Sequence, residues 1–263
     1  MLSVIIPVRN EYENLEEIER QFSLNLKDIE YEVILVNDFS DDNTLQKAEE
    51  ISKHNSRFIF LDNKKKGLGG AITLGIENSQ GKFTCIMMAD LSDDINDLKK
   101  YYHLMYSKNL DAVFGSRFLE ESKVVNYPKQ KLILNRIFNF IVKILFLNKF
   151  NDYTNAFKIY KTEILKSFMP LVSESFNIFL EMPLKVISRR YSYEVIPINW
   201  QGRVKGEAKF NIKELGSKYL FTLLYCLIEK ILLYKKKIMT LKNSASIFLI
   251  CVLIIILILS VFF

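Results

Sequence analysis

The sequence predicts an α/β fold in which a mixed, mainly parallel sheet carries helices on both faces, followed by interfacial helices and one C-terminal transmembrane helix. Short apolar runs alternate with polar segments of helical spacing through the first 115 residues, which is typical of strand–helix–strand units. Apolar segments with a few charges follow, and residues 245–263 carry no charge at all. We expect residues 1–210 to form the sheet domain, 211–240 an amphipathic juxtamembrane helix and 245–263 the membrane span.

Five apolar runs are predicted to be strands: Leu2–Val8, Tyr31–Asn37, Phe58–Leu61, Phe83–Met88 and Ala112–Phe114. The segments between them are predicted to be helices: Leu15–Phe22, Thr44–Ile51, Ala71–Ile76 and Ile95–Tyr106. Further along the chain we expect helices at Thr162–Phe168 and Asn177–Arg190 and a strand at Tyr193–Ile198. Open parallel sheets bind ligands beyond the carboxyl ends of their strands, so we expect a site in the loops that follow these strands.

Two later segments are apolar but interrupted by charges. Leu132–Phe150 contains three basic residues, and we interpret it as a helix in the membrane interface, with a buried core helix as the alternative. Ile212–Leu233 is interrupted by Glu229 and Lys230, so its apolar part is too short to span a bilayer. We expect this helix to lie at the interface or against a partner helix.

Residues 245–263 are predicted to cross the membrane. As a helix they would span about 28 Å, close to the hydrocarbon thickness of a bilayer. A buried core helix normally keeps a polar stripe, which this segment lacks. Four lysines precede it, and by the positive-inside rule they predict a single-pass protein with its sheet domain on the cytoplasmic side: Lys235, Lys236, Lys237 and Lys242.

Composition excludes several classes of protein. Hydrophobic residues make up 49% of the 263 residues, too many for a disordered chain, and Gly 9 and Pro 5 are too few for collagen. Cys85, Cys226 and Cys251 match no disulfide scaffold or metal site, so we expect reduced thiols in a cytosolic setting. The net charge of +6 fits an anionic membrane surface or a phosphate-bearing substrate, and we expect no nucleic-acid partner because no such binding signature is present.

Carboxylates follow two of the predicted strands. Asp38 comes directly after Tyr31–Asn37, and Asp90 follows Phe83–Met88. If the sheet is parallel, both reach the edge where a nucleotide binds. An Asx turn or a helix N-cap is the alternative for each of them.

Other loops after strands carry glycine or positive charge. Gly67-Leu68-Gly69-Gly70 lacks the third glycine of a dinucleotide fingerprint, so we reject a dehydrogenase and expect these glycines to let the loop pack close to a ligand. Arg203 and Lys209 form a basic loop that can close over a diphosphate, with a flexible surface loop as the alternative. Arg117 follows the fifth strand, where a guanidinium suits phosphate.

Taken together, the chain resembles family 2 glycosyltransferases, and among them the dolichol-phosphate mannose synthase type of polyprenyl-phosphate sugar synthase. Seven segments match in order: Ser3–Glu11, Val36–Asp42, Gly67–Gly69, Ala89–Ser92, Gly115–Phe118, Asp152–Phe157 and Arg203–Lys209. The resemblance implies a GT-A (Rossmann-like) fold for residues 1–210. It also implies inverting transfer from a nucleotide-diphosphate sugar to a polyprenyl (dolichyl or undecaprenyl) phosphate at the cytoplasmic membrane face, and it leaves room for a homo-oligomer.

The resemblance also implies roles for single residues. The nucleotide sugar is bound by Pro7, Arg9, Glu11, Val36, Asp38, Ala89, Asp90, Arg203 and Lys209. The acceptor phosphate is bound by Arg117, Lys131 and Asn135, and the catalytic set is Asp90, Arg117, Arg203 and Lys209. Asp90 is the metal ligand, and the implied cofactor is Mg²⁺ or Mn²⁺.

The chain departs from the family pattern at Met88, where the family usually has a second carboxylate for the metal. A thioether does not replace a carboxylate for a hard cation. We expect Asp90 and the diphosphate to hold the ion, with Asp93 or Asp94 contributing through water. Arg9, Lys131 and Asn135 also differ from the residues common in the family.

Two alternative functions remain open from the sequence. One is a membrane-anchored glycosyltransferase acting on a hydroxyl of a cell-envelope glycan, which requires a general base, with Asp152 and Glu181 as candidates. The other is a non-catalytic nucleotide-sugar-binding protein. A lipid phosphate needs no such base, because its second pKa is about 6 and it is already ionised near neutral pH.

Overall fold

The computed structural model describes residues 1–202 and 212–235. The predicted membrane span at 245–263 and the loop with Arg203 and Lys209 lie outside these residues. Within the described part, no helix combines the length and the apolar character needed to cross a bilayer.

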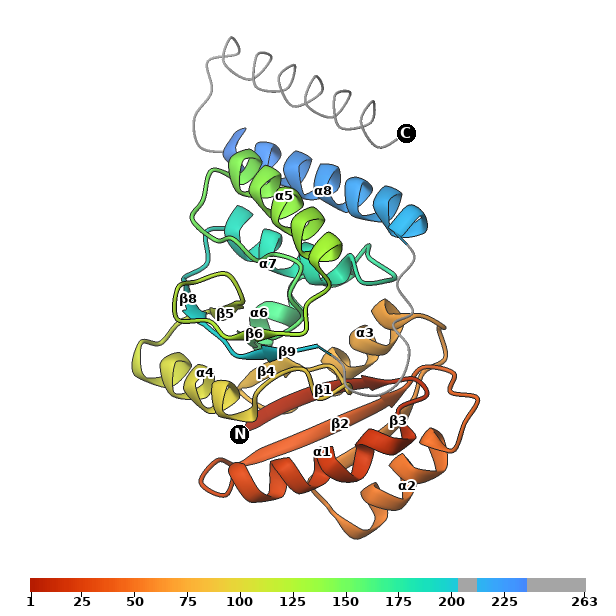
Figure 1. Cartoon of the computed structure of the whole chain (residues 1–263). Coiled ribbons are helices and arrows are strands. Elements are labelled where there is room, and N and C mark those ends of the chain that lie inside the picture. Colours follow the sequence, from red (N-terminus) through yellow and green to blue (C-terminus); the bar gives the residue numbers. More distant parts are fainter. Residues whose placement is uncertain (203–211, 236–263) are drawn as a thin grey trace.

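A seven-stranded sheet forms the centre of the molecule, in the order β3-β2-β1-β4-β7-β5-β8 (Figure 1). Its strands are β1 (Leu2–Val8), β2 (Tyr31–Asn37), β3 (Phe58–Asp62), β4 (Phe83–Ile86), β5 (Ala112–Ser116), β7 (Lys158–Lys161) and β8 (Tyr193–Pro197). All neighbours are parallel except at β7, which runs antiparallel to β4 and β5. The predicted mixed, mainly parallel sheet is confirmed. A two-stranded ribbon of β6 (Val124–Val125) and β9 (Trp200–Gln201) lies beside it.

Helices cover both faces of the sheet, as predicted. One face packs against α1 (Tyr12–Asn25), α2 (Thr44–His54) and α4 (Ile95–Ser107), and the other against α3 (Leu68–Asn78), α6 (Thr162–Lys166) and α7 (Ile178–Ser188). Strand β1 is buried along its whole length because it faces both layers: Val4 and Ile6 pack in the first core and Ile5 in the second.

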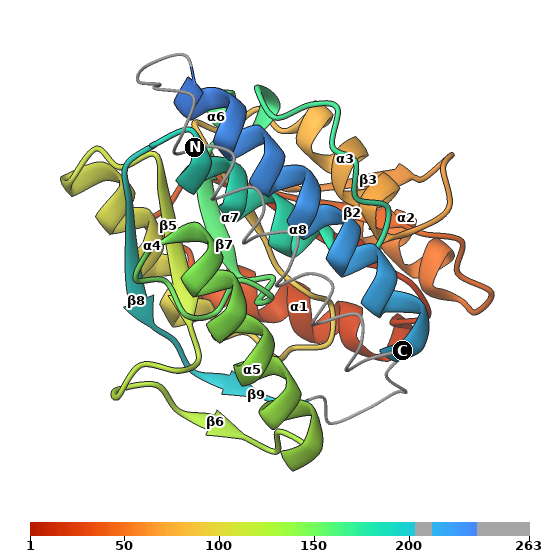
Figure 2. The same cartoon turned by 90° about the horizontal axis from the view of Figure 1, so that it is seen from above.

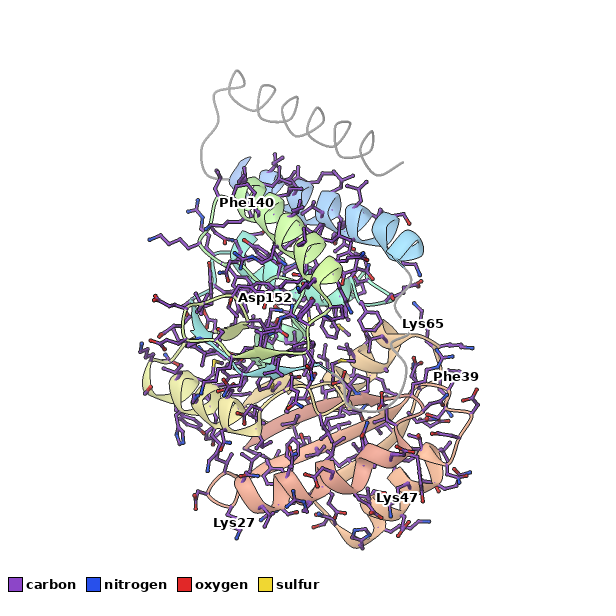
Figure 3. All side chains as sticks on the ribbon, in the orientation of Figure 1. Lys27, Phe39, Lys47, Lys65, Phe140 and Asp152 are labelled. Carbon is purple, nitrogen blue, oxygen red and sulfur yellow. The ribbon has the colours of Figure 1, made fainter. Side chains whose placement is uncertain are left out.

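Helices α5 (Lys129–Phe146) and α8 (Ile212–Lys235) lie next to each other beyond α7 (Figures 1 and 2). Helix α5 buries Asn139, Val142 and Phe146 on its inner side. Its outer side and that of α8 expose large apolar side chains, which together we call the α5–α8 apolar surface: Ile133, Leu134, Ile137, Phe140, Ile144, Leu147, Phe221, Ile228, Leu232 and Leu233. Phe140 points outward from α5, whereas Asp152 lies in the interior (Figure 3).

Strands β1, β2, β4 and β5 all end at the same edge of the sheet, because they run in the same direction. The loops after the first three each hold one non-glycine residue in the left-handed region: Asn10 (φ 58), Phe39 (φ 57) and Leu91 (φ 58). Such a backbone is costly for leucine and phenylalanine and persists only where surrounding contacts impose it. The surrounding structure therefore fixes the backbone conformation of these turns.

Candidate active site

Asp38 connects two loops on the donor side of the edge. Its backbone N–H donates to Val8 O at 2.9 Å, and its Oδ1 accepts from Asn63 Nδ2 at 2.9 Å and from the backbone N of Gly67 at 2.7 Å. Among the described hydrogen bonds of this side chain, all use Oδ1, so Oδ2 remains for a ligand. The carboxylate thus holds the glycine loop in place, and it does not cap helix α2, whose N-cap is Asn43.

The glycine loop packs differently from the sequence expectation. At Gly69 an added Cβ would overlap the backbone carbonyl oxygen of Ser173, and the N–H of Gly69 donates to Glu174 O at 3.1 Å. The close approach at Gly69 is therefore to the protein backbone rather than to a ligand, which corrects the expectation for that residue. Gly67 needs its glycine for another reason, because its φ is 122.

The other predicted nucleotide residues lie at the same edge. Pro7 and Val36 are paired in register on β1 and β2, one residue before the strands end. Arg9 is exposed in the following loop. Glu11 is buried at the start of α1, where its backbone N–H donates to Thr44 Oγ1 at 2.9 Å and its Oε2 accepts from Asn14 Nδ2 at 2.7 Å.

Asp90 lies in the loop after β4, beside the buried Ala89. Its Oδ1 accepts the backbone N–H of Ser92 at 3.2 Å. Both oxygens of Asp94, one of the two residues expected to reach the metal through water, already accept a hydrogen bond: Oδ1 caps helix α4 at Asn96 N (2.9 Å), and Oδ2 accepts from Asn199 Nδ2 at 3.1 Å.

Within residues 1–202 and 212–235, no group of three or more His, Cys, Asp or Glu could hold a metal ion. Asp93 is 6% exposed, and burial, followed by the nearby charge of Asp90, raises its pKa to about 7. The negative charges of Asp90 and Asp93 repel each other, so binding of a cation beside them would be favourable. A Mg²⁺ ion is commonly held by one or two carboxylates together with substrate phosphates and water, so Asp90 would fit a cation that binds together with the substrate.

Arg117, after β5, is held by Asp152. Arg117 Nε donates to Asp152 Oδ2 at 2.9 Å and Nη2 to Oδ1 at 2.8 Å, and the backbone N of Arg117 also donates to Oδ2 at 2.9 Å. The two side chains are 7% and 0% exposed. Burial disfavours the guanidinium charge, but Asp152 outweighs it and holds the pKa of Arg117 above its ordinary value. Three aromatic rings lie 5.4 to 5.6 Å from the guanidinium carbon: Phe118, Tyr127 and Trp200.

The Asp152–Asn155 segment connects the predicted acceptor residues. Thr154 Oγ1 accepts from Asn135 Nδ2 at 2.8 Å, and the backbone N of Tyr153 donates to Asn139 Oδ1 at 2.6 Å. Both asparagines belong to α5, whereas Asp152 holds the loop after β5. Figure 3 shows Asp152 between α5 and the sheet.

Lys158, the first residue of β7, is hydrogen-bonded to the Asp152–Asn155 segment. It is 1% exposed, and its Nζ donates to Tyr153 O at 3.1 Å and to Asn155 O. Burial lowers the pKa of Lys158 to about 7, although Asp152 raises it. The sequence alone does not indicate a role for this lysine, because a lysine at the start of a strand is usually a surface residue.

Lys131, in the first turn of α5, interacts electrostatically with both Arg117 and Asp90. Burial lowers its pKa, the charge of Arg117 lowers it further and the charge of Asp90 raises it. Lys131 therefore lies within electrostatic range of both residues. The structure brings together predicted residues from three segments: Asp90 after β4, Arg117 after β5, and Lys131 with Asn135 on α5.

The loop with Arg203 and Lys209 begins next to this cluster. The backbone N of Gln201 donates to Ser92 O at 3.1 Å, and that of Gly202 donates to Val125 O at 2.8 Å. The described chain therefore reaches residue 202 beside the Asp90 loop, while both predicted diphosphate residues lie outside it. Their roles stay predictions.

Both candidate bases are already engaged. Both oxygens of Asp152 accept from Arg117. Glu181 is 0% exposed, its two oxygens accept the backbone N–H groups of Val172 (3.1 Å) and Ser173 (2.9 Å), and Lys185 Nζ lies 3.4 Å away. In this structure neither carboxylate is positioned to take a proton from a hydroxyl acceptor.

The fold defines an α/β protein whose polar side chains gather at the carboxyl edge of a mainly parallel sheet, and comparison with known sequences establishes the family. Residues 3–168 match the family described as Glycosyl transferase family 2. The chain belongs to this family, so the predicted family and the glycosyltransferase class are confirmed.

Two curated relatives are similar over most of this chain. A dolichol-phosphate mannosyltransferase from Pyrococcus furiosus is 29% identical over 217 residues, which cover 81% of this chain and 60% of the relative. Glycosyltransferase AglD from Haloferax volcanii is 24% identical over 230 residues, which cover 84% of this chain and 36% of the relative. The chain thus spans less than two thirds of the length of these relatives.

Solved structures share the fold. Glucosyl-3-phosphoglycerate synthase from Mycobacterium tuberculosis, in complex with Mn²⁺, uridine diphosphate and phosphoglyceric acid, matches with a TM-score of 0.67 and 14% identity, covering 86% of this chain and 78% of that one. The complex of that synthase with Mg²⁺ and uridine diphosphate matches with a TM-score of 0.66 and 15% identity, covering 86% and 79%. At this identity the likeness shows the GT-A-like fold alone.

Proposed function

We propose that the protein transfers a sugar, with inversion, from a nucleotide-diphosphate sugar to a polyprenyl phosphate at the cytoplasmic face of a membrane. The observation that carries the proposal is the pair of cations at the carboxyl edge of the sheet: Arg117, buried and held by Asp152, and Lys131, which interacts electrostatically with Arg117 and Asp90. Two anions have to meet in this reaction, and they repel unless positive groups lie between them. Arg117 and Lys131 supply those groups.

The state of the carboxylates favours a phosphate acceptor over a hydroxyl. A polyprenyl phosphate arrives ionised and attacks the sugar carbon without losing a proton to the protein. A hydroxyl acceptor needs a positioned base, and Asp152 and Glu181 are occupied by Arg117 and by backbone N–H groups. The glycan-directed alternative therefore has no base among the two residues that the sequence offered.

The donor would lie along the ends of β1, β2 and β4, with its base and ribose near Asp38 and its diphosphate near Asp90. A divalent cation held by Asp90 and the diphosphate would neutralise charge that builds up on the leaving nucleoside diphosphate. The family resemblance implies that Arg203 and Lys209 also neutralise charge on the leaving diphosphate. Similar solved structures with uridine diphosphate and Mn²⁺ or Mg²⁺ support this arrangement.

The membrane part of the proposal is supported by three observations. The α5–α8 apolar surface is exposed on the same helix, α5, that carries Lys131 and Asn135. The sequence predicts a membrane span at 245–263. The similar protein from Pyrococcus furiosus is named for a dolichol-phosphate acceptor. We infer that α5 lies at the membrane surface and presents the acceptor phosphate to Arg117.

A transfer assay tests the proposal. The purified full chain is incubated with radiolabelled nucleotide sugars, polyprenyl phosphate and Mg²⁺ or Mn²⁺, and a glycosyl-phosphate lipid is expected with at least one donor. Asp90→Ala should abolish turnover, whereas the matched control Asp28→Ala, an exposed residue outside the site, should leave it unchanged. Nucleotide binding without glycolipid for every common donor would instead support a non-catalytic binding protein.

A further inference from the structure

Glu181 is a buried carboxylate that the proposed reaction does not use as a base. It lies in the first turn of α7. Its two oxygens accept the backbone N–H groups of Val172 at 3.1 Å and of Ser173 at 2.9 Å. Lys185, one turn further along α7, places its Nζ 3.4 Å from the same carboxylate. A buried charge is costly unless it is paired and hydrogen-bonded, so these contacts fix both the side chain and the backbone that it holds.

The backbone held in this way, residues 172–174, lies between helices α8 and α3, and we call it the pre-α7 segment (Figure 2). On one side, Ser173 Oγ lies 3.2 Å from Thr222 Oγ1 of α8. On the other side, Glu174 O accepts the backbone N–H of Gly69, in the first turn of α3, at 3.1 Å. An added Cβ at Gly69 would overlap Ser173 O, so α3 and the segment touch backbone to backbone.

The glycine loop connects the pre-α7 segment with Asp38. The backbone N–H of Gly67 donates to Asp38 Oδ1 at 2.7 Å, and an added Cβ at Gly67 would lie 3.0 Å from Glu174 O. Lys65, in the same loop, pairs with the Glu174 carboxylate at 3.0 Å, an exposed contact that adds little by itself. The loop therefore lies between Asp38 and the pre-α7 segment, and its position depends on both.

A purely structural role is the ordinary explanation for a buried, paired glutamate, and Glu229 on α8 separates the two roles. Its described ion pairs are with Lys185 Nζ at 3.7 Å and with Arg189 Nε at 2.8 Å. Glu229 thus shares the charged partner of Glu181, whereas the hydrogen bonds to the backbone of the pre-α7 segment come from Glu181. Removing the charge of either residue disturbs the same ion-pair network, but only the change at Glu181 releases this backbone.

We propose that Glu181 is a positioning residue for the nucleotide-sugar donor: it holds the pre-α7 segment, which sets the position of the glycine loop and, through Gly67, that of the Asp38 carboxylate. This inference rests on the proposed function. It gives a role in donor binding to a side chain that the sequence offered only as a base for a hydroxyl acceptor. It also makes α7 a support of the donor side of the sheet edge.

Hydrogen exchange in the ligand-free full chain tests the positioning step alone. Glu181→Gln keeps the size of the side chain but replaces one accepting oxygen by an NH2 group, so one of the two backbone N–H groups loses its partner. We expect faster deuterium uptake in residues 63–71 than in the wild type. Glu229→Gln is the matched control and should leave uptake in these residues unchanged. Equal uptake in the two variants would overturn the inference.

Nucleotide binding measured without acceptor tests the consequence for the donor. Uridine diphosphate and guanosine diphosphate, each with Mg²⁺, are titrated calorimetrically into the wild type and both variants. For the nucleotide that binds the wild type, Kd should rise at least about fivefold in Glu181→Gln, the lower end of usual coupling between sites, and stay unchanged in Glu229→Gln. Wild-type affinity in Glu181→Gln would overturn the inference. Because no sugar is transferred, this comparison is independent of the acceptor in the proposed function.

A second pair of variants applies where Glu181→Gln folds poorly. Glu181→Gln with Lys185→Met removes both charges, and neutral side chains of similar volume often replace a buried ion pair without loss of stability. Its control is Glu229→Gln with Lys185→Met. The first double variant, unlike its control, should show faster exchange in residues 63–71 and weaker nucleotide binding. A lower unfolding temperature with unchanged exchange in residues 63–71 would assign Glu181 a structural role only and contradict the proposal.

Discussion

Arg117 and Asp152 illustrate how a buried ion pair serves position more than stability. Removing two charges from water costs several kcal/mol per ion, and their attraction repays this only with good geometry. Here the pair is bidentate, and Asp152 also accepts the backbone N–H of Arg117. The guanidinium is therefore held in one orientation.

Asp152→Asn should disturb both stability and acceptor binding. An amide offers one acceptor oxygen instead of two, so the free energy of unfolding should fall by about 3 kcal/mol, as for broken buried pairs. The KM for polyprenyl phosphate should rise more than kcat falls, because Arg117 loses its orientation. Asp111→Asn, which disturbs the less buried pair with Lys161, is the control. A loss confined to kcat would instead indicate that Asp152 acts as a base.

Lys158 should make stability depend on pH. Its pKa is lowered to about 7 in the native chain, mainly by burial, and is about 10.4 in an unfolded one. Between these values the unfolded chain binds a proton that the native chain lacks, so this group's contribution to stability rises as pH increases from 7 to 10. In Lys158→Met the slope of unfolding free energy against pH, measured in urea, should be smaller by this contribution. A slope identical to that of the wild type would contradict the assignment.

The polar residues of the site divide into those that the sequence could identify and those that it could not. Asp38, Asp90 and Arg117 follow apolar runs directly, so their place at the sheet edge could be predicted. Lys158 could not, because a lysine in a strand has an ordinary explanation as a surface residue. Its place under the Asp152–Asn155 segment is visible only from contacts made in the folded chain.

At the scale of elements, the parallel strands were predictable because continuous apolar runs are typical of strands buried on both faces. Strand β7 was missed: it has four residues and begins and ends with lysine. The structure shows that the first of these lysines is buried under the Asp152–Asn155 segment and the second pairs with Asp111. A short antiparallel strand with functional polar residues leaves no periodic signal in the sequence.

Gly69 and Gly216 form a matched pair for testing the contact between helix α3 and the loop before α7. Gly69→Ala places a Cβ against the backbone of Ser173 and Glu174, which cannot move aside easily, so the chain should be destabilised and the donor KM raised. At Gly216 in α8, nothing lies within 4 Å of an added Cβ, and alanine should raise stability by up to about 1 kcal/mol. Urea midpoints measure both, and equal effects would contradict the close packing at Gly69.

At the scale of the whole molecule, helix α5 carries both the predicted acceptor residues Lys131 and Asn135 and part of the α5–α8 apolar surface. Exposed apolar patches rimmed by polar residues mark contact sites with membranes or proteins. The inner side of α5 faces Asp152–Asn155, while Phe140 points away from the sheet (Figure 3). Helix α5 thus carries exposed apolar side chains on one side and contacts the Asp152–Asn155 segment on the other.

A double variant tests this layer. Phe140→Glu with Ile144→Glu should lower activity with polyprenyl phosphate in vesicles, because charged side chains disfavour contact with the bilayer. Activity with a short, soluble prenyl phosphate should stay unchanged, since neither side chain lies in the site. Leu24→Glu, an exposed apolar position on α1, is the control and should change neither activity. Equal losses with both acceptors would indicate damage to the fold instead.

The most direct measurement of the central claim compares two acceptors that differ only in the phosphate. The full chain receives its preferred nucleotide sugar together with either polyprenyl phosphate or the corresponding polyprenol, and products are separated by mass spectrometry. We predict a glycosyl-phosphate lipid from the first and no product from the second, because a phosphate needs no base and the two candidate bases, Asp152 and Glu181, are already engaged. Transfer to the polyprenol at a similar rate would contradict the account.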